Sequence, residues 1–255
     1  LGMTTLAQMQ GISLSEMDGI KLMNRIDSKY VTTEAVLGQI LERCVSSFRV
    51  LETSGGRLAS YDTVYYDTDD LKMYFEHHNR RLDREKIRVR RYCDTGECFI
   101  ELKHKNNHGR TRKKRRQIDP SFFPDCKSCD EALRFIAAKS RYRLEDTSPA
   151  VRTRFSRITL TDNNLSERIT IDSKLCFDNF RTGRSSTLDD AVIIEIKQDG
   201  HASSLMKSIL LDLRVKPLRL SKYCVGTVLT NAEVKNSRFK EKLRAVGKMT
   251  GKRYL

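Results

Sequence analysis

The sequence predicts an α+β protein built on a closed antiparallel β-barrel, a tunnel lined by lysine and arginine with helices packed outside. Two observations support this fold class. Residues 85–91 place cations at alternate positions, Lys86, Arg88 and Arg90, with apolar residues between them, which is the pattern of a strand between two environments. Similar alternation recurs in three further segments, at residues 97–103, 168–172 and 191–197. Because charged faces recur on several strands, we expect them to line a shared cavity.

Composition narrows the class of partner. The 255-residue chain has 48 Lys and Arg against 33 Asp and Glu, a formal net charge of +15. Such a surplus attracts polyanions: nucleic acid, an anionic membrane surface or a small polyanion. We expect one domain over residues 1–255, with a core at about 24–230 and a basic C-terminal helix at 231–255.

Cysteine usage and apolar runs indicate the compartment. The seven cysteines are an odd number without the framework of small secreted domains, which favours a reducing environment. Cys126 and Cys129 have C-x-x-C spacing but no second pair to complete a zinc site. No run of eighteen apolar residues occurs. We therefore expect a soluble, cytoplasmic domain without a membrane-spanning segment.

The N-terminal third alternates helices and a strand. Residues 13–22 have the apolar spacing of a short amphipathic helix, and Thr32 or Thr33 is a suitable N-cap for the next helix. After a glycine turn at 54–56, residues 59–67 are rich in Tyr, Thr and Val and predict a strand. Residues 69–78 are expected to form a short helix or turn.

The rest of the chain is mainly strands. A turn at 94–96 joins strands 85–91 and 97–103 as a hairpin. The run 110–116 is densely basic, which is more often a solvated segment than a site. Further elements are expected as a helix at 129–139, strands at 151–160, 168–172 and 191–197, and helices at 205–213 and after residue 236.

Eight short segments of the sequence occur in a characteristic order: residues 25–31, 65–71, 86–92, 101–103, 154–157, 168–172, 194–197 and 220–223. They span most of the chain, and the ordered series is more specific than any one segment. In this order they resemble the VTC-type polyphosphate polymerase domain of the triphosphate tunnel metalloenzyme (CYTH-like) superfamily.

The resemblance and the alternating faces together name candidate site residues. The residues expected to stabilise the transferred phosphoryl group are Arg88, Arg90, Lys103, Arg157, Arg168 and Lys222. Those expected to bind the substrate are Lys29, Lys86, Lys105, Lys114, Lys197 and Ser221. Glu195, and Glu101 beside Lys103, are the expected ligands of Mn²⁺ or Mg²⁺, hard cations that prefer oxygen. Lys113 is adjacent to Lys114, and the register of the basic run stays open. Lys105 and Phe155 stand where the family pattern has His and Tyr.

The resemblance implies a metal-dependent polymerase that transfers the γ-phosphate of ATP to a growing polyphosphate chain. No Walker loop is present, so side chains would recognise the phosphates. A triphosphatase is an alternative, although hydrolytic relatives carry Glu-x-Glu-x-Lys where this chain has Arg25, Asp27 and Lys29. A polyphosphate-binding protein without turnover is another. A nucleic-acid binder is the weakest, since no helix-turn-helix, zinc-finger or RNP pattern occurs. A peripheral membrane partner and the oligomeric state stay open.

Overall fold

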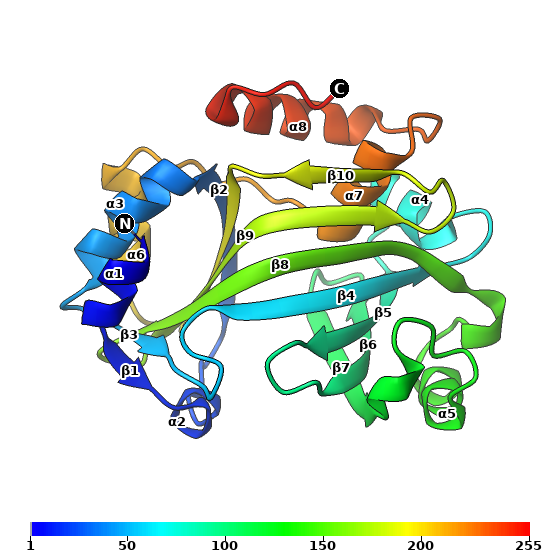
Figure 1. Cartoon of the computed structure of the whole chain (residues 1–255), viewed down its shortest axis with the longest axis horizontal. Coiled ribbons are helices and arrows are strands. Elements are labelled where there is room, and N and C mark those ends of the chain that lie inside the picture. The colour runs from blue at the N-terminus through cyan, green and yellow to red at the C-terminus, as the bar shows by residue number, and fades with distance from the viewer. Residues whose placement is uncertain (1) are drawn as a thin grey trace.

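A large, mainly antiparallel sheet is the centre of the fold, in a computed structural model that describes residues 2–255 (Figure 1). Eight strands form one path in the order β2-β11-β9-β8-β4-β5-β6-β7, and three shorter strands bring the sheet to eleven. β10 pairs with β9, and β3 pairs with β8 and, in parallel, with β1. The strands are β1 (Gln10–Ile12), β2 (Ile26–Thr33), β3 (Phe48–Leu51), β4 (Ala59–Asp67), β5 (Arg84–Tyr92), β6 (Cys98–Lys105), β7 (Thr111–Ile118), β8 (Ser148–Asp162), β9 (Glu167–Asn179), β10 (Ser185–Leu188) and β11 (Ala191–Gln198).

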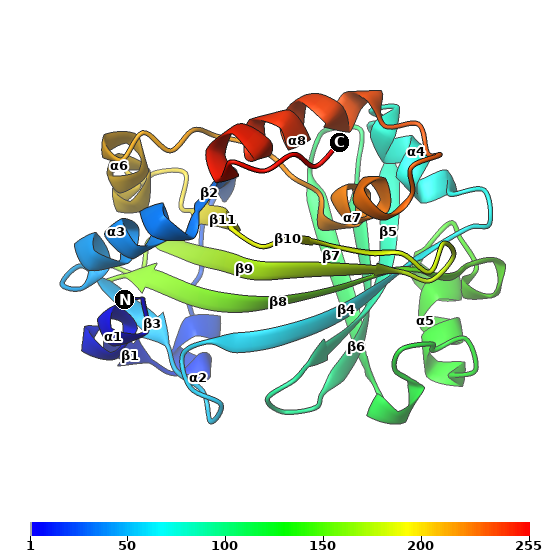
Figure 2. The ribbon, with the colours of Figure 1, turned by 45° about the horizontal axis from the view of Figure 1, so that its top comes forward.

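The sheet twists strongly along this path. In Figure 2, β5, β6 and β7 run at a steep angle to β8 and β9, with β4 at the change of direction. The right-handed twist of successive strands accumulates in this way in open sheets.

The expected closed barrel is wrong: the sheet is open. Within residues 2–255, β2 and β7 do not pair with each other. β7 carries the basic run, and Lys and Arg on an edge strand oppose further pairing. The free edge of β2 is instead bordered by residues 217–221, since the Leu218 amide donates to the Lys29 carbonyl at 3.0 Å.

Helices cover the sheet in three groups. Around β2 and β11 lie α1, α3 and α6, beside β6 and β7 lies α5, and α4, α7 and α8 lie together, with α8 along the top (Figures 1 and 2). The helices are α1 (Gly2–Gln8), α2 (Leu14–Asp18), α3 (Glu34–Cys44), α4 (Lys72–His78), α5 (Asp130–Lys139), α6 (Leu205–Asp212), α7 (Lys222–Thr230) and α8 (Ser237–Thr250), with 3-10 turns at Pro120–Phe122 and Leu144–Asp146.

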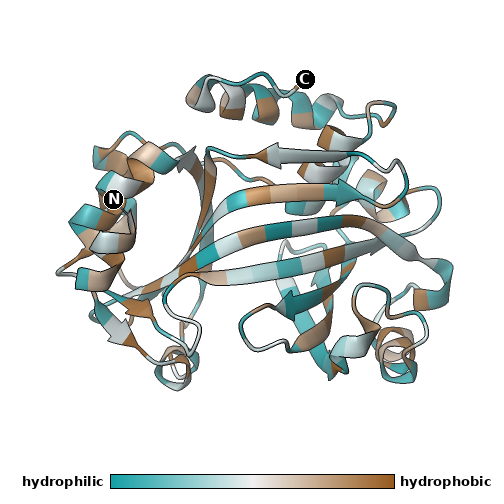
Figure 3. Ribbon diagram, in the orientation of Figure 1, coloured by the Kyte–Doolittle hydropathy of each residue, from teal (hydrophilic) through white to brown (hydrophobic). Residues whose placement is uncertain are grey.

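Each group of helices buries its own apolar cluster. Ile40 of α3 packs with Ile169 and Ile194 of the sheet, and Ile136 of α5 packs with Ile87 and Ile100. These two clusters lie on the face of the sheet opposite the alternating charges, as the period of two requires. Figure 3 shows the alternation as hydrophilic and hydrophobic bands along single strands. A third cluster lies under α7 and α8.

Most predicted elements are confirmed, with shifted ends. The strand at 59–67 is β4, and Thr33 is the N-cap of α3, accepting from the Val36 amide at 3.3 Å. The basic run at 110–116, expected to be a solvated segment, forms most of β7, and the residues of this run in β7 are exposed. The C-terminal helix is shorter than 231–255, because it begins at Ser237 and ends at Thr250 before Gly251 at φ +72°.

Candidate active site on the charged face of the sheet

Strand register gathers the alternating charges on one face. Residues paired directly across neighbouring antiparallel strands project to the same side. Lys29 pairs with Glu195, Lys86 with Lys103, and Arg157 with Asp172. We call the central part of this side the charged face; its residues are Asp27, Lys29, Glu195, Lys197, Arg168, Asp172, Arg157, Lys86, Arg88, Arg90, Glu101, Lys103, Lys113 and Arg115. Cations clearly outnumber carboxylates on it.

Arg88 and Glu101 form a buried ion pair. The Arg88 Nε lies 2.5 Å from Glu101 Oε2, with Arg88 5% and Glu101 0% exposed. Burial raises the pKa of Glu101, but the charges of Arg88 and Arg90 outweigh it and hold that pKa well below its usual range. Glu101 is therefore ionised and fixes the Arg88 guanidinium, which also donates to the Tyr65 hydroxyl at 3.4 Å.

Asp172 holds two cations from different elements. Arg157 binds it through two nitrogens, at 2.6 and 2.8 Å, and Lys222 Nζ lies 2.7 Å from Oδ2. Burial opposes ionisation, yet Arg157 and Lys222 lower the pKa of Asp172 well below its usual range. The Lys222 ammonium also lies 4.7 Å from the centre of the Phe155 ring, a cation–π contact.

The start of α7 reaches this face from the other side. Apolar residues on the charged side of the sheet, Val151 and Ile193, pack with Tyr223 of α7. Ser221 is the N-cap of α7 and accepts from the Cys224 amide at 3.3 Å. The same hydroxyl accepts from Lys86 Nζ at 3.0 Å, so the helix start is tied to β5.

Four ionisable groups on the charged face are left without a partner among the described residues: Lys29, Lys103, Glu195 and Lys197. The guanidinium of Arg88, with burial, lowers the pKa of Lys103 well below its usual value. Burial raises the pKa of Glu195, but Lys29, Lys197 and Lys103 outweigh it and lower that pKa to about 2. Half-buried cations that repel one another are stabilised by a bound anion. The face is therefore suited to a polyanion.

Glu195 is the carboxylate of the charged face that best fits a divalent metal. Within residues 2–255, no three His, Cys, Asp or Glu residues converge as a metal site. Glu101 forms ion pairs with Arg88 and Lys113, and Asp172 forms ion pairs with Arg157 and Lys222. Glu195, although opposite Lys29 in the strand register, forms no ion pair within residues 2–255. Mg²⁺ needs only one or two protein carboxylates when phosphates and waters complete its shell. We keep Glu195 as the candidate ligand; Glu101, also expected to bind metal, is occupied by ion pairs.

The structure brings together most of the predicted site residues. The predicted residues that lie on or beside the charged face are Arg88, Arg90, Lys103, Arg157, Lys222, Lys29, Lys86, Lys197, Ser221 and Glu195. Arg168 lies toward its border, 3.9 Å from Asp18, and Lys105 follows Lys103 at the end of β6. Asp172 was missed as a site residue, although it closes the alternating segment 168–172.

The prediction of Lys114 is corrected by the register of β7. Lys114 pairs with Leu102, whose side chain belongs to the apolar cluster under α5, whereas Lys113 pairs with Lys103. Lys113 Nζ also lies 3.5 Å from Glu101 Oε1. Counting alternate residues back across the β6–β7 hairpin would have identified Lys113, but the length of the turn is not evident from sequence.

Lys113→Met should weaken the binding of tripolyphosphate by about tenfold, the effect of losing one charged hydrogen-bond donor. Lys114→Met removes the same charge from the opposite side and should change affinity less than about twofold. Burial lowers the pKa of Lys113 to about 8, so its contribution should fade as pH rises through 8. Titration calorimetry at pH 7 and pH 9 measures both effects. Equal losses in the two variants would contradict the register.

Solved structures of two other proteins have a similar fold. A putative adenylate cyclase from Bacillus halodurans is similar with a TM-score of 0.50 at 14% identity, over 78% of this chain and 96% of that one. A putative adenylyl cyclase from Hippeastrum, described as having a dominant triphosphatase activity, is similar with a TM-score of 0.52 at 13% identity, over 80% of this chain and 95% of its own. At these identities the similarity shows a shared fold.

The chain belongs to the VTC domain family, whose pattern matches residues 24–231. No curated protein matches the sequence. Among the helices of residues 2–255, none has both the length and the apolar character needed to span a bilayer.

Proposed function

We propose that this domain is a metal-dependent polyphosphate polymerase that transfers the γ-phosphoryl group of ATP to a growing polyphosphate chain on the charged face. One observation carries the proposal: cations from β2, β5, β6, β8, β11 and α7 converge on one surface where Glu195 is the unpaired carboxylate. Arg forks and Lys point charges together suit a chain of phosphates, since each can hold an oxygen without fixing the register. The VTC family membership supports the same substrate class.

The reaction needs positioning more than covalent chemistry by the protein. The bond from the γ-phosphorus to the bridging oxygen of ATP breaks, a bond forms to a terminal oxygen of the chain, and ADP leaves. Arg88, Arg90 and Lys103 offset the charge of the transferred group. Arg157 and Lys222, fixed by Asp172, hold the neighbouring phosphates. A divalent ion held by Glu195 supplies further charge neutralisation when bound.

Chain synthesis from ATP with Mn²⁺ or Mg²⁺ tests the proposal, with product length followed on a gel. The wild type should form long chains and release ADP, and Arg88→Ala should form none. Lys114→Ala is the control, since it removes a cation from the opposite face. Release of inorganic phosphate without chains would assign hydrolysis, and binding without turnover would assign a polyphosphate-binding protein. Failure of the wild type to bind any phosphate chain would refute all three.

Triphosphate hydrolysis is the second candidate because the Hippeastrum protein of similar fold is described as a triphosphatase. The N-terminal end of β2 disfavours it here. Asp27, the one carboxylate of this stretch, lies 2.8 Å from Arg25 in an ion pair. The hydrolytic pattern Glu-x-Glu-x-Lys would supply two carboxylates, so this chain has fewer ligands for a metal that activates water.

A further inference from the structure

The cations continue past the charged face to the border of the sheet. Arg84 pairs with Lys105 across β5 and β6, two residues beyond the Lys86–Lys103 pair and on the same side. Two residues of an antiparallel strand span about 7 Å. Arg84 and Lys105 therefore extend the positive surface by about 7 Å, farther than a single phosphate group reaches.

Two further cations approach the same border from the C-terminal part of the chain. Arg219 precedes α7 and donates to the Asp27 carbonyl of β2 at 3.3 Å. Lys242 of α8 donates to the Arg219 carbonyl at 2.7 Å. Helix α8 and the segment before α7 thus meet the free edge of β2, where the sheet stays open.

The charge of Arg219 acts on both Lys105 and Lys242. Burial lowers the pKa of Lys105, and Arg84, Arg219 and Lys29 lower it further. Burial also lowers the pKa of Lys242, with Arg219 and Lys29 among the charges that add to it. Lys29 and Arg219 line one opening of about 340 Å³ at the edge of β2, and their charges reach both Lys105 and Lys242.

Carboxylates near this opening are already engaged. Asp83 lies 2.7 Å from His104 and 3.4 Å from Arg141, which also reaches Glu76 at 2.7 Å. Among the residues that the structure describes, Arg84, Lys105, Arg219 and Lys242 have no carboxylate partner. The structural ion pairs of the region therefore leave these four charges available for an external anion.

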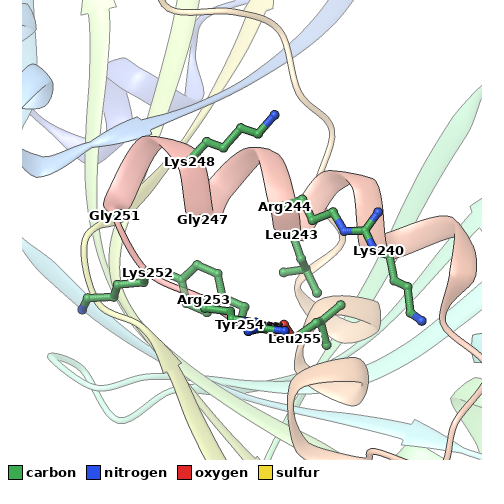
Figure 4. A pocket seen from close by; sticks show the side chains of 10 residues that line it. All are labelled: Lys240, Leu243, Arg244, Gly247, Lys248, Gly251, Lys252, Arg253, Tyr254 and Leu255. Atoms are coloured by element: carbon green, nitrogen blue, oxygen red, sulfur yellow. Dashed lines mark hydrogen bonds between the residues drawn. The ribbon is translucent and has the colours of Figure 1, made fainter.

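We propose that Arg84, Lys105, Arg219 and Lys242, the basic mouth, bind the part of a linear polyphosphate chain that extends beyond the charged face. This rests on the proposed binding of phosphate chains, and it adds a chain-length preference: a long chain reaches the mouth, and triphosphate does not. The mouth differs from the open pocket of about 640 Å³ under α8 (Figure 4), which is lined by the C-terminal tail and other α8 residues, Lys240 and Arg244 among them.

The test compares two double variants of the full chain that lose the same charge. Arg219→Gln with Lys242→Gln changes the mouth, and Lys240→Gln with Arg244→Gln changes the neighbouring pocket on the same helix. The mouth variant should bind long-chain inorganic polyphosphate about tenfold more weakly and tripolyphosphate within about twofold of wild type. The pocket variant should bind both like wild type. The salt dependence for long chains should fall by about 0.7 per lost cation, by analogy with single-stranded nucleic acids.

Three results would contradict the proposed role of the basic mouth. They are an equal loss of affinity for both ligands, an equal loss of affinity in both variants, or displacement of the long chain by single-stranded DNA as readily as by polyphosphate. If the wild type does not turn over ATP but the mouth variant loses long-chain binding, the basic mouth would be supported as a binding site and the polymerase activity would be contradicted. A wild type that binds neither ligand would reject both. Thermal unfolding of each variant verifies that it is folded.

Discussion

Glu195→Gln should lower polyphosphate synthesis from ATP by about 10²–10³-fold, the usual effect of removing one group that stabilises transition-state charge. Glu195 is the unpaired carboxylate of the charged face, and nearby lysines keep it ionised, with a pKa of about 2. Glutamine keeps the size of the side chain and loses the charge that a divalent ion requires. The Mn²⁺ concentration for half-maximal activity should therefore rise as well. Initial rates over a range of Mn²⁺ measure both.

Binding of tripolyphosphate without metal separates a metal ligand from a structural ion pair. Removing Glu195 takes a neighbouring negative charge from Lys29, Lys103 and Lys197, and of these only Lys197 still has Asp27 opposite it, so metal-free affinity should rise by at least about threefold. Glu42→Gln, an exposed change on α3, should alter neither quantity. Unchanged Mn²⁺ dependence in Glu195→Gln would show that this carboxylate only balances the lysines.

Glu101→Gln should lower the free energy of unfolding by about 3–5 kcal/mol, because it leaves the buried Arg88 guanidinium without its counter-charge. For a protein of this size such a loss lowers Tm by about 10 °C. Tripolyphosphate should restore more stability to the variant than to wild type, since a bound anion replaces the missing charge. Calorimetric unfolding with and without tripolyphosphate measures this.

The pH dependence of that difference follows from the lowered pKa of Glu101. A carboxylate whose pKa is lower in the folded than in the unfolded state stabilises the fold above its unfolded pKa, which is 4.5 here. The gap between wild type and Glu101→Gln should be constant above about pH 5 and should shrink as pH falls below 4.5. The exposed Glu97→Gln beside β6 is the control. A gap that does not change with pH would mean that Glu101 is not ionised.

Several local structures could be read from the sequence because they depend on neighbouring residues. The alternation of Lys86, Arg88 and Arg90 placed those cations on one side of β5, and Thr33 was one of the two threonines expected to cap the following amphipathic helix. Lys114 was misassigned because every residue from 112 to 116 is basic, so the sequence does not show which of these side chains point to which face of the strand. Only the pairing of β7 with β6 decides which lysine shares a side with Lys103.

The sequence by itself determined that cations alternate along several strands, that they outnumber carboxylates, and that their order follows the VTC family. Tertiary structure alone decided that the sheet stays open, because edge pairing depends on how charged strands β2 and β7 meet after the whole sheet has twisted. It also decided which carboxylates are neutralised. Glu101, Asp172 and Glu195 are alike in sequence, but their partners come from other strands and from α7, and long-range packing leaves Glu195 free.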